Sequence, residues 1–231
     1  MNKDDNGMSP IKTSSTVDSD GDAELTPQPS QNTYFGISFK QEYGLTQFFA
    51  LVLISSTTMA VGMYMTAQMT FLLENDFHIS NQEKGQINSN LVTFSIPFTV
   101  FMTAIVSYAF EIIGRKWTLF LSFFMTSLVL IYIPYTSPSL TLLYACRCTI
   151  GLTMAAPVAH PLLVDWVEKQ SRGKGLALMG IGTLLGNIYA MGILFNFTKD
   201  MNFKSAFLIA GLNIMIVSFV LLFMIKDPDL S

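Results

Sequence analysis

One arginine stands alone in a long uncharged segment of this sequence. Arg147 lies within residues 140–151, where every other side chain is apolar, small or carries only a hydroxyl or thiol. A cation at the centre of a bilayer costs roughly 2.5–3.5 kcal/mol on insertion scales, and such a residue usually faces a bundle interior or a wet cavity. A guanidinium stays charged and binds carboxylates and phosphates through paired hydrogen bonds. Arg147 is therefore the first candidate for binding an anionic or polar group of a solute.

Three further residues inside apolar segments are candidates for the same cavity. Gln68 and Asn187 are uncharged hydrogen-bonding residues, and Tyr64 lies one helical turn from Gln68 on the same face. The alternative is that each amide joins two helices, for about 0.6 kcal/mol. Cys146 and Cys148 are not spaced as a Cys-x-x-Cys pair. With no catalytic constellation in the sequence, we expect no enzyme activity, no metal site and no cofactor.

The composition places these residues in a membrane protein. The sequence is 51% hydrophobic and 13% charged, with a mean hydropathy of +0.45, whereas soluble domains have about 25% charged residues. A bilayer crossing requires about 20 helical residues. Six apolar segments of sufficient length predict helices rather than barrel strands, because they do not alternate polar with apolar residues: Thr46–Leu73, Ile87–Glu111, Trp117–Tyr135, Leu140–Trp166, Leu176–Phe197 and Phe203–Ile225. We expect an all-α membrane protein with six transmembrane helices.

The segments outside the helices predict three regions. Residues 1–40 are rich in Asp, Ser, Thr, Gln and Pro and poor in large apolar residues, which predicts a disordered acidic tail. Residues 41–227 form the predicted six-helix domain, and residues 228–231 are expected to begin a central loop.

The basic residues predict the orientation. One side of the predicted bundle carries Lys40, Arg115, Lys116, Lys169, Arg172, Lys174 and Lys226, and the other carries Lys84, Lys199 and Lys204. Because Lys and Arg concentrate in cytosolic loops, both termini are expected in the cytosol. The sequence does not distinguish the plasma membrane from an internal membrane.

The loop between the second and third predicted helices resembles that of the major facilitator superfamily, commonly G-x-x-x-D-R-x-G-R-[RK]. The matching positions are Glu111, Gly114, Arg115 and Lys116, whereas Ser107 and Ile112 replace the leading glycine and the first basic residue. The resemblance implies that this loop secures one gate state of a transporter.

Further matches follow in order along the chain. Arg147 and Gly151 resemble the R-x-x-x-G of the fourth helix, and Asp165 with Arg172 resembles the acidic-x6-Arg pattern of the loop after it. Gly182 and Gly186 have the spacing of the glycines in the family's antiporter signature, but the proline of that signature is absent. Small residues allow close helix approach in membranes. Gly151, Gly182 and Gly186 are therefore expected to pack helices.

The resemblance covers about residues 45–225 and implies the N-terminal six-helix half of a transporter. Such a half contains two inverted three-helix repeats, and substrate binds between two halves near the midplane. The resemblance thus implies transport of a small solute by alternating access. The expected partners are an anionic or polar solute, the lipid bilayer, and a second six-helix half or another copy of the chain, without nucleic acid.

Two questions stay open at the level of sequence. The chain is either a truncated half or a half that pairs with itself or with another half. A different class of function is also compatible with a single half, namely a non-transporting scaffold or regulatory subunit that docks on a membrane complex.

Overall fold

The structure is a computed structural model that describes residues 32–80, 82–159 and 161–227. The chain divides into two units, Met1–Ser30 and Gln31–Ser231, and all described residues belong to the second. The predicted tail up to residue 31 and the predicted loop at residues 228–231 lie outside the described residues.

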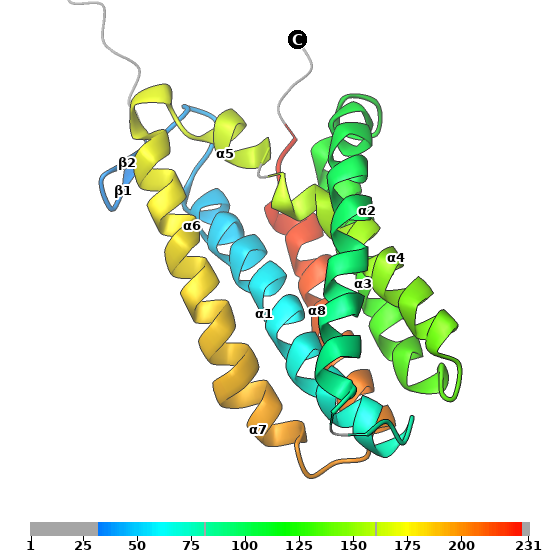
Figure 1. The fold of residues 1–231 in the computed structure, drawn as a ribbon. Coiled ribbons are helices and arrows are strands. Elements are labelled where there is room, and N and C mark those ends of the chain that lie inside the picture. The colour runs from blue at the N-terminus through cyan, green and yellow to red at the C-terminus, as the bar shows by residue number, and fades with distance from the viewer. Residues whose placement is uncertain (1–31, 81, 160, 228–231) are drawn as a thin grey trace, which may run out of the picture. The chain divides into compact units, whose positions relative to one another are not determined.

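Six long apolar helical segments make up the described unit, and each is long and apolar enough to cross a membrane (Figure 1). In chain order the elements are α1 (Leu45–Asn75), α2 (Lys84–Ile112), α3 (Arg115–Tyr132) followed by η1 (Ile133–Tyr135), α4 (Leu140–Val158) followed by α5 (Pro161–Trp166), η2 (Lys169–Ser171), α6 (Arg172–Asn187) continued by the π-helical η3 (Ile188–Leu194) and α7 (Phe195–Thr198), and α8 (Phe203–Met224). The predicted all-α, six-span fold class is confirmed.

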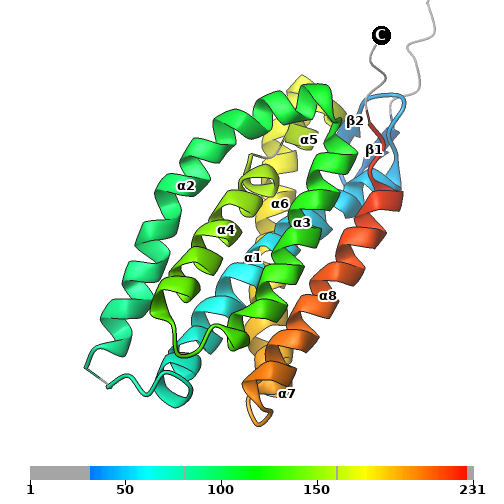
Figure 2. The same ribbon diagram turned by 90° about the vertical axis from the view of Figure 1, so that its right-hand side faces the viewer.

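The spans pair in a pattern that has the symmetry of an inverted repeat. The most extensive contacts join α1 to α6, α2 to α4 and α3 to α8, and Figure 2 shows α4 between α2 and α3. Exchanging the first three spans for the last three converts the α1–α6 pair into the α4–α2 pair and leaves the α3–α8 pair unchanged. This is the packing expected of two three-helix units that are related as inverted repeats.

In each of these three pairs a glycine faces the backbone of the partner helix. A Cβ atom at Gly151 would lie 2.8 Å from the carbonyl oxygen of Ser95. A Cβ at Gly182 would lie 2.8 Å from the carbonyl oxygen of Val52, and one at Gly211 would lie 2.9 Å from that of Ser127. Because lipid gives no hydrophobic drive for helix association, such close contacts supply the van der Waals energy that holds the pairs together.

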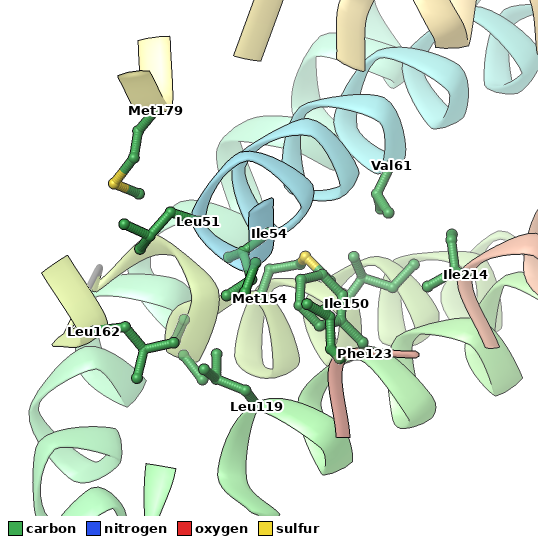
Figure 3. Packing of buried hydrophobic residues seen from close by; sticks show 14 of the residues in the cluster. Leu51, Ile54, Val61, Leu119, Phe123, Ile150, Met154, Leu162, Met179 and Ile214 are labelled. Atoms are coloured by element: carbon green, nitrogen blue, oxygen red, sulfur yellow. The ribbon is translucent and has the colours of Figure 1, made fainter. Parts of the chain in front are cut away.

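The helices meet around an apolar interior (Figure 3). Leu51 of α1 and Phe123 of α3 are 1% and 0% exposed. Met154 of α4, Leu162 of α5 and Met179 of α6 belong to the same cluster. A polar side chain at this level therefore bonds within its own helix, as Ser55 Oγ does to the carbonyl oxygen of Leu51, or to a neighbouring helix.

A β-hairpin precedes the first span, where the sequence predicted disorder up to residue 40. Strands β1 (Asn32–Tyr34) and β2 (Ile37–Phe39) pair antiparallel around a two-residue turn whose residues, Phe35 and Gly36, both have positive φ, as such turns require. Composition hid the hairpin because only alternate residues are buried: Ile37 and Phe39 are 4% and 0% exposed.

The hairpin is attached to the segment between the fourth and fifth spans. Phe39 forms an antiparallel bridge with Val167, and the Lys40 amide donates to the carbonyl oxygen of Trp166 at 2.9 Å. The end of the bundle that carries the hairpin and α5 is called the hairpin end below, and the end that carries α7 is called the opposite end (Figure 1).

The glycine contacts predict a position-specific cost of side-chain volume. Gly182→Val should lower the free energy of unfolding by about 1–3 kcal/mol, because the new side chain overlaps the backbone of α1. Gly180→Val is the matched control on the same helix, since nothing lies within 4 Å of a Cβ at Gly180. Unfolding of the purified protein in mild detergent measures both. Equal effects of the two substitutions would show that α1 and α6 do not pack through Gly182.

Candidate functional site

Arg147 lies about two turns into α4 and reaches toward α1. Its Nη1 donates to the thioether sulfur of Met65 at 2.6 Å, and its side chain is partly buried. A thioether is a weak acceptor with no negative charge. The two ion pairs found among the described residues involve other side chains. Arg147 therefore holds its charge inside the apolar bundle without a carboxylate partner in the described part of the chain.

A polar contact between α1 and α2 lies beside this contact. Asn88 Nδ2 donates to the carbonyl oxygen of Thr66, the residue after Met65, at 3.3 Å and to Thr70 Oγ1 at 3.0 Å. Thr66 itself is exposed. Asn88 was not among the candidates from the sequence, because it is the second residue of the predicted span Ile87–Glu111 and follows a polar segment. Helices α1, α2 and α4 thus bring a cation, an amide and hydroxyl groups to one stretch of α1.

Tyr64 and Gln68 form a separate cluster. Gln68 Nε2 donates to Thr198 Oγ1 at 3.2 Å, and the Tyr64 hydroxyl lies 3.0 Å from the same oxygen. The Tyr64 hydroxyl also donates to the carbonyl oxygen of Ala206 at 3.1 Å. Both residues are 2% exposed, and their partners lie on α7 and α8. This placement favours a role in joining helices over lining a cavity with Arg147.

Asn187 ends α6 and is half-buried. It follows Gly186, where an added Cβ atom would overlap the backbone of Ser56 on α1. No hydrogen bond joins Asn187 to Arg147 within the described ranges. Asn187 lies at the junction of α6 with η3, and its role in lining a cavity stays a prediction.

The hairpin end carries an ion pair that sequence spacing did not predict. Arg115, the first residue of α3, pairs with Asp165 of α5, and their side chains are 25% and 17% exposed. Arg172 donates instead to the carbonyl oxygen of Val164 at 3.1 Å. Glu111 is exposed at the end of α2. Asp165 and Arg172 of the acidic-x6-Arg pattern therefore bind different partners. The ion pair joins α5 to the start of α3.

Asp227, which follows α8, joins this group of contacts. Its Oδ1 accepts from the backbone amide of Lys116 at 2.8 Å, and a Cβ at Gly114, whose φ is +88°, would lie 3.0 Å from its Oδ2. An acidic group at a helix N-terminus is favoured by the exposed amides and the helix dipole. Trp166 Nε1 also donates to the carbonyl oxygen of Lys226 at 3.3 Å.

The hairpin end therefore combines four chain segments around charged groups. The loop before α3, the helix α5, the residues after α8 and the β-hairpin are connected through Arg115, Asp165, Asp227 and Trp166. A charged cluster at one end and an uncompensated cation inside the bundle can hold one conformation and attract an anion.

Comparison with known families gives a match that covers most of the chain. The family model described as Major Facilitator Superfamily matches residues 34–231, which include strand β2 and all six spans. A search of curated proteins found no match.

The ion pair between Arg115 and Asp165 should contribute to stability more than an exposed pair does. A double-mutant cycle with Arg115→Ala and Asp165→Ala should give a coupling energy of about 1–3 kcal/mol, because removing one partner leaves a poorly solvated charge. The control pair Lys84–Glu74, whose side chains are 22% and 43% exposed at the opposite end, should give less than about 1 kcal/mol. Denaturant unfolding in detergent measures both cycles, and equal coupling in the two cycles would contradict a special role for the first pair.

Proposed function

The chain belongs to the major facilitator superfamily, and we propose that it forms one wall of a pathway that carries a small anionic or polar solute across the membrane by alternating access. Membership implies solute transport by an integral, multi-pass membrane protein. Members of the family are generally transporters rather than enzymes, and the comparisons do not favour the scaffold alternative.

The observation that carries the choice of solute is the environment of Arg147. Its guanidinium lies in a partly buried position against Met65, with no carboxylate from the described residues to offset its charge. A desolvated guanidinium is stabilised best by a carboxylate or phosphate bound through two parallel hydrogen bonds. A solute with such a group would supply the missing acceptor.

The same face of the bundle offers neutral hydrogen-bonding groups. Thr66 is exposed, and Asn88 joins α2 to α1 beside Met65. We place the solute against α1, α2 and α4, with Arg147 as its anchor and these groups as secondary contacts. Asn187 is retained as a candidate at the edge of this wall. Tyr64 and Gln68 would stabilise the wall by joining α1 to α7 and α8.

The pathway requires a second wall. In the family's architecture two six-helix halves enclose the substrate near the midplane. We propose that the facing half comes from a further part of the same polypeptide, from a second copy, or from another chain of the family. In each case its surface opposite Arg147 should carry polar or acidic groups.

We propose that the contacts at the hairpin end hold one state of the gate. Arg115–Asp165 and Lys116–Asp227 both join segments that belong to different spans. Because both contacts lie within this half, rigid-body rocking against a second half would leave them intact, and they would hold the hairpin end in the shape that the second half meets. Arg172 would stabilise the same gate state through α5, because its guanidinium donates to the carbonyl oxygen of Val164.

We propose that the hairpin end faces the cytosol. It carries most of the basic residues, including Arg115, Lys116 and Lys226, whereas Lys84, Lys199 and Lys204 lie at the opposite end. Cytosolic loops of membrane proteins are enriched in Lys and Arg.

Substitution of Arg147 tests the anion site. In proteoliposomes that contain the protein, uptake should be measured for organic anions, phosphate compounds, sugars, amino acids and organic cations. For an anionic solute that is taken up, Arg147→Gln should weaken the apparent affinity by roughly 10- to 100-fold, since a charge-assisted hydrogen bond contributes about 1.5–3 kcal/mol. Arg147→Lys should be impaired less, because it keeps the charge but loses the paired geometry.

A neighbouring substitution separates binding from structure. Met65→Leu removes the sulfur acceptor but keeps the volume, so it should leave the affinity for the anion within about threefold of the parent. Unchanged affinity in both Arg147 variants would assign the guanidinium a structural role and end the proposal for this site.

The orientation is testable by labelling of single cysteines. In a background with Cys146→Ala and Cys148→Ala, Glu42→Cys at the hairpin end should react with a membrane-impermeant maleimide only after permeabilisation of cells. Gln86→Cys near the start of α2 should react in intact cells; both positions are exposed. The reverse pattern would place the hairpin end outside.

A further inference from the structure

A cavity of about 370 Å³ lies between η3 and α8, with α1 as its floor. Small-molecule sites have volumes of roughly 300–1,000 Å³. The lining comes from residues 53–64 of α1, 185–194 of α6 and η3, and 210–217 of α8, together with Leu130 of α3. Met65, the contact of Arg147, does not belong to the lining. The cavity is therefore distinct from the proposed solute wall.

The mouth of the cavity is apolar and exposed. Leu185, which belongs to the lining, is 49% exposed. Both α6 and α8 pack on α1, and the crevice between them opens past this side chain. In a membrane such surfaces meet acyl chains, so a ligand would enter from the hydrocarbon phase and must partition into it.

Inside the cavity the polar groups are few and uncharged. They are the Tyr189 hydroxyl, the Asn213 amide and the hydroxyl groups of Ser56, Thr57 and Tyr64. Tyr189 of η3 and Asn213 of α8 together offer several donors and acceptors, since a primary amide alone has two donors and an acceptor. The Tyr64 hydroxyl, in contrast, is already bonded to Ala206 and Thr198. The described lining contains no Lys, Arg, Asp or Glu.

The helix that forms one wall has an unusual backbone. Residues Ile188–Leu194 are π-helical, and Tyr189 and Leu194 of this segment line the cavity. π-helical turns are rare and occur frequently at functional sites. The antiporter signature would place a proline in this span, and here a π-helical turn reshapes the helix without one.

We propose that this cavity binds a neutral, sterol-sized membrane lipid with a single hydroxyl group. Its hydroxyl would bond to the Tyr189–Asn213 pair, and its hydrocarbon body would fill the apolar remainder. A charged headgroup would find no counter-charge in the described lining.

Photolabelling in lipid nanodiscs tests the proposal. The probe is cholesterol that carries a diazirine on its ring system and a free 3-hydroxyl group. Adducts mapped by mass spectrometry should fall on residues 53–64, 185–194 and 210–217. Excess cholesterol should compete for labelling, whereas cholesterol sulfate, which is charged at the same position, should compete at least about tenfold less well.

Two kinds of variant define the site. Val217→Phe and Ala60→Phe narrow the cavity from two different helices and should each lower labelling by about tenfold or more. Ile216→Phe adds the same ring to the lipid-facing side of α8 and should leave labelling unchanged. Tyr189→Phe combined with Asn213→Leu keeps the volume and should abolish the preference for the 3-hydroxyl probe over its 3-ketone analogue.

The photolabelling experiment either supports or overturns the proposed site. Labelling that is confined to the cavity, blocked by the narrowing variants and selective for the hydroxyl supports the site. Labelling spread over the exposed apolar surface, or unaffected by both narrowing variants, overturns it. The readout is a covalent adduct rather than transport, so the outcome is independent of whether Arg147 binds an anion.

Discussion

The bundle depends on the close approach of helices at three glycine contacts. Gly151, Gly182 and Gly211 each face a backbone carbonyl of the partner helix. In a membrane the apolar side chains gain little by leaving lipid, so packing must come from distances that larger residues would prevent. Because the three contacts belong to the three pairs related by the inverted repeat, the half can act as a rigid body whose motions are concentrated at its ends.

This rigidity explains where charge is tolerated. Ionisable groups gather at the hairpin end, where Arg115, Asp165 and Asp227 satisfy backbone groups and one another. Arg147 is the exception, held within the span by packing against Met65. A rigid wall would keep the guanidinium in place without a carboxylate partner from the described residues, which is the condition under which the proposed anion would gain most from binding.

The sequence predicted the elements better than their partners. Long apolar segments define the six spans because the cost of exposing backbone in lipid leaves few alternatives to a helix. The glycine spacing of the fourth and fifth spans predicted close packing, but which carbonyl each would meet depends on helix rotation. Asp165 shows the limit: its spacing from Arg172 is local, whereas its partner Arg115 lies fifty residues away and is chosen by tertiary structure. Gln68 was similarly ambiguous, because an amide inside a span serves a cavity or a neighbouring helix equally well.

The β-hairpin has a consequence for the assembly of the chain in the membrane. Its strands emerge from the ribosome before the first span, yet its partners, Trp166 and Val167, emerge only after the fourth. During synthesis the backbone of β2 therefore cannot pair with Val167 until the four intervening helices have been made. Once Phe39 pairs with Val167, the ends of this long segment are joined on one side of the bilayer, a result that an odd number of insertions would prevent. The contact therefore forms late in synthesis, and only in chains that have both segments on the same side of the bilayer.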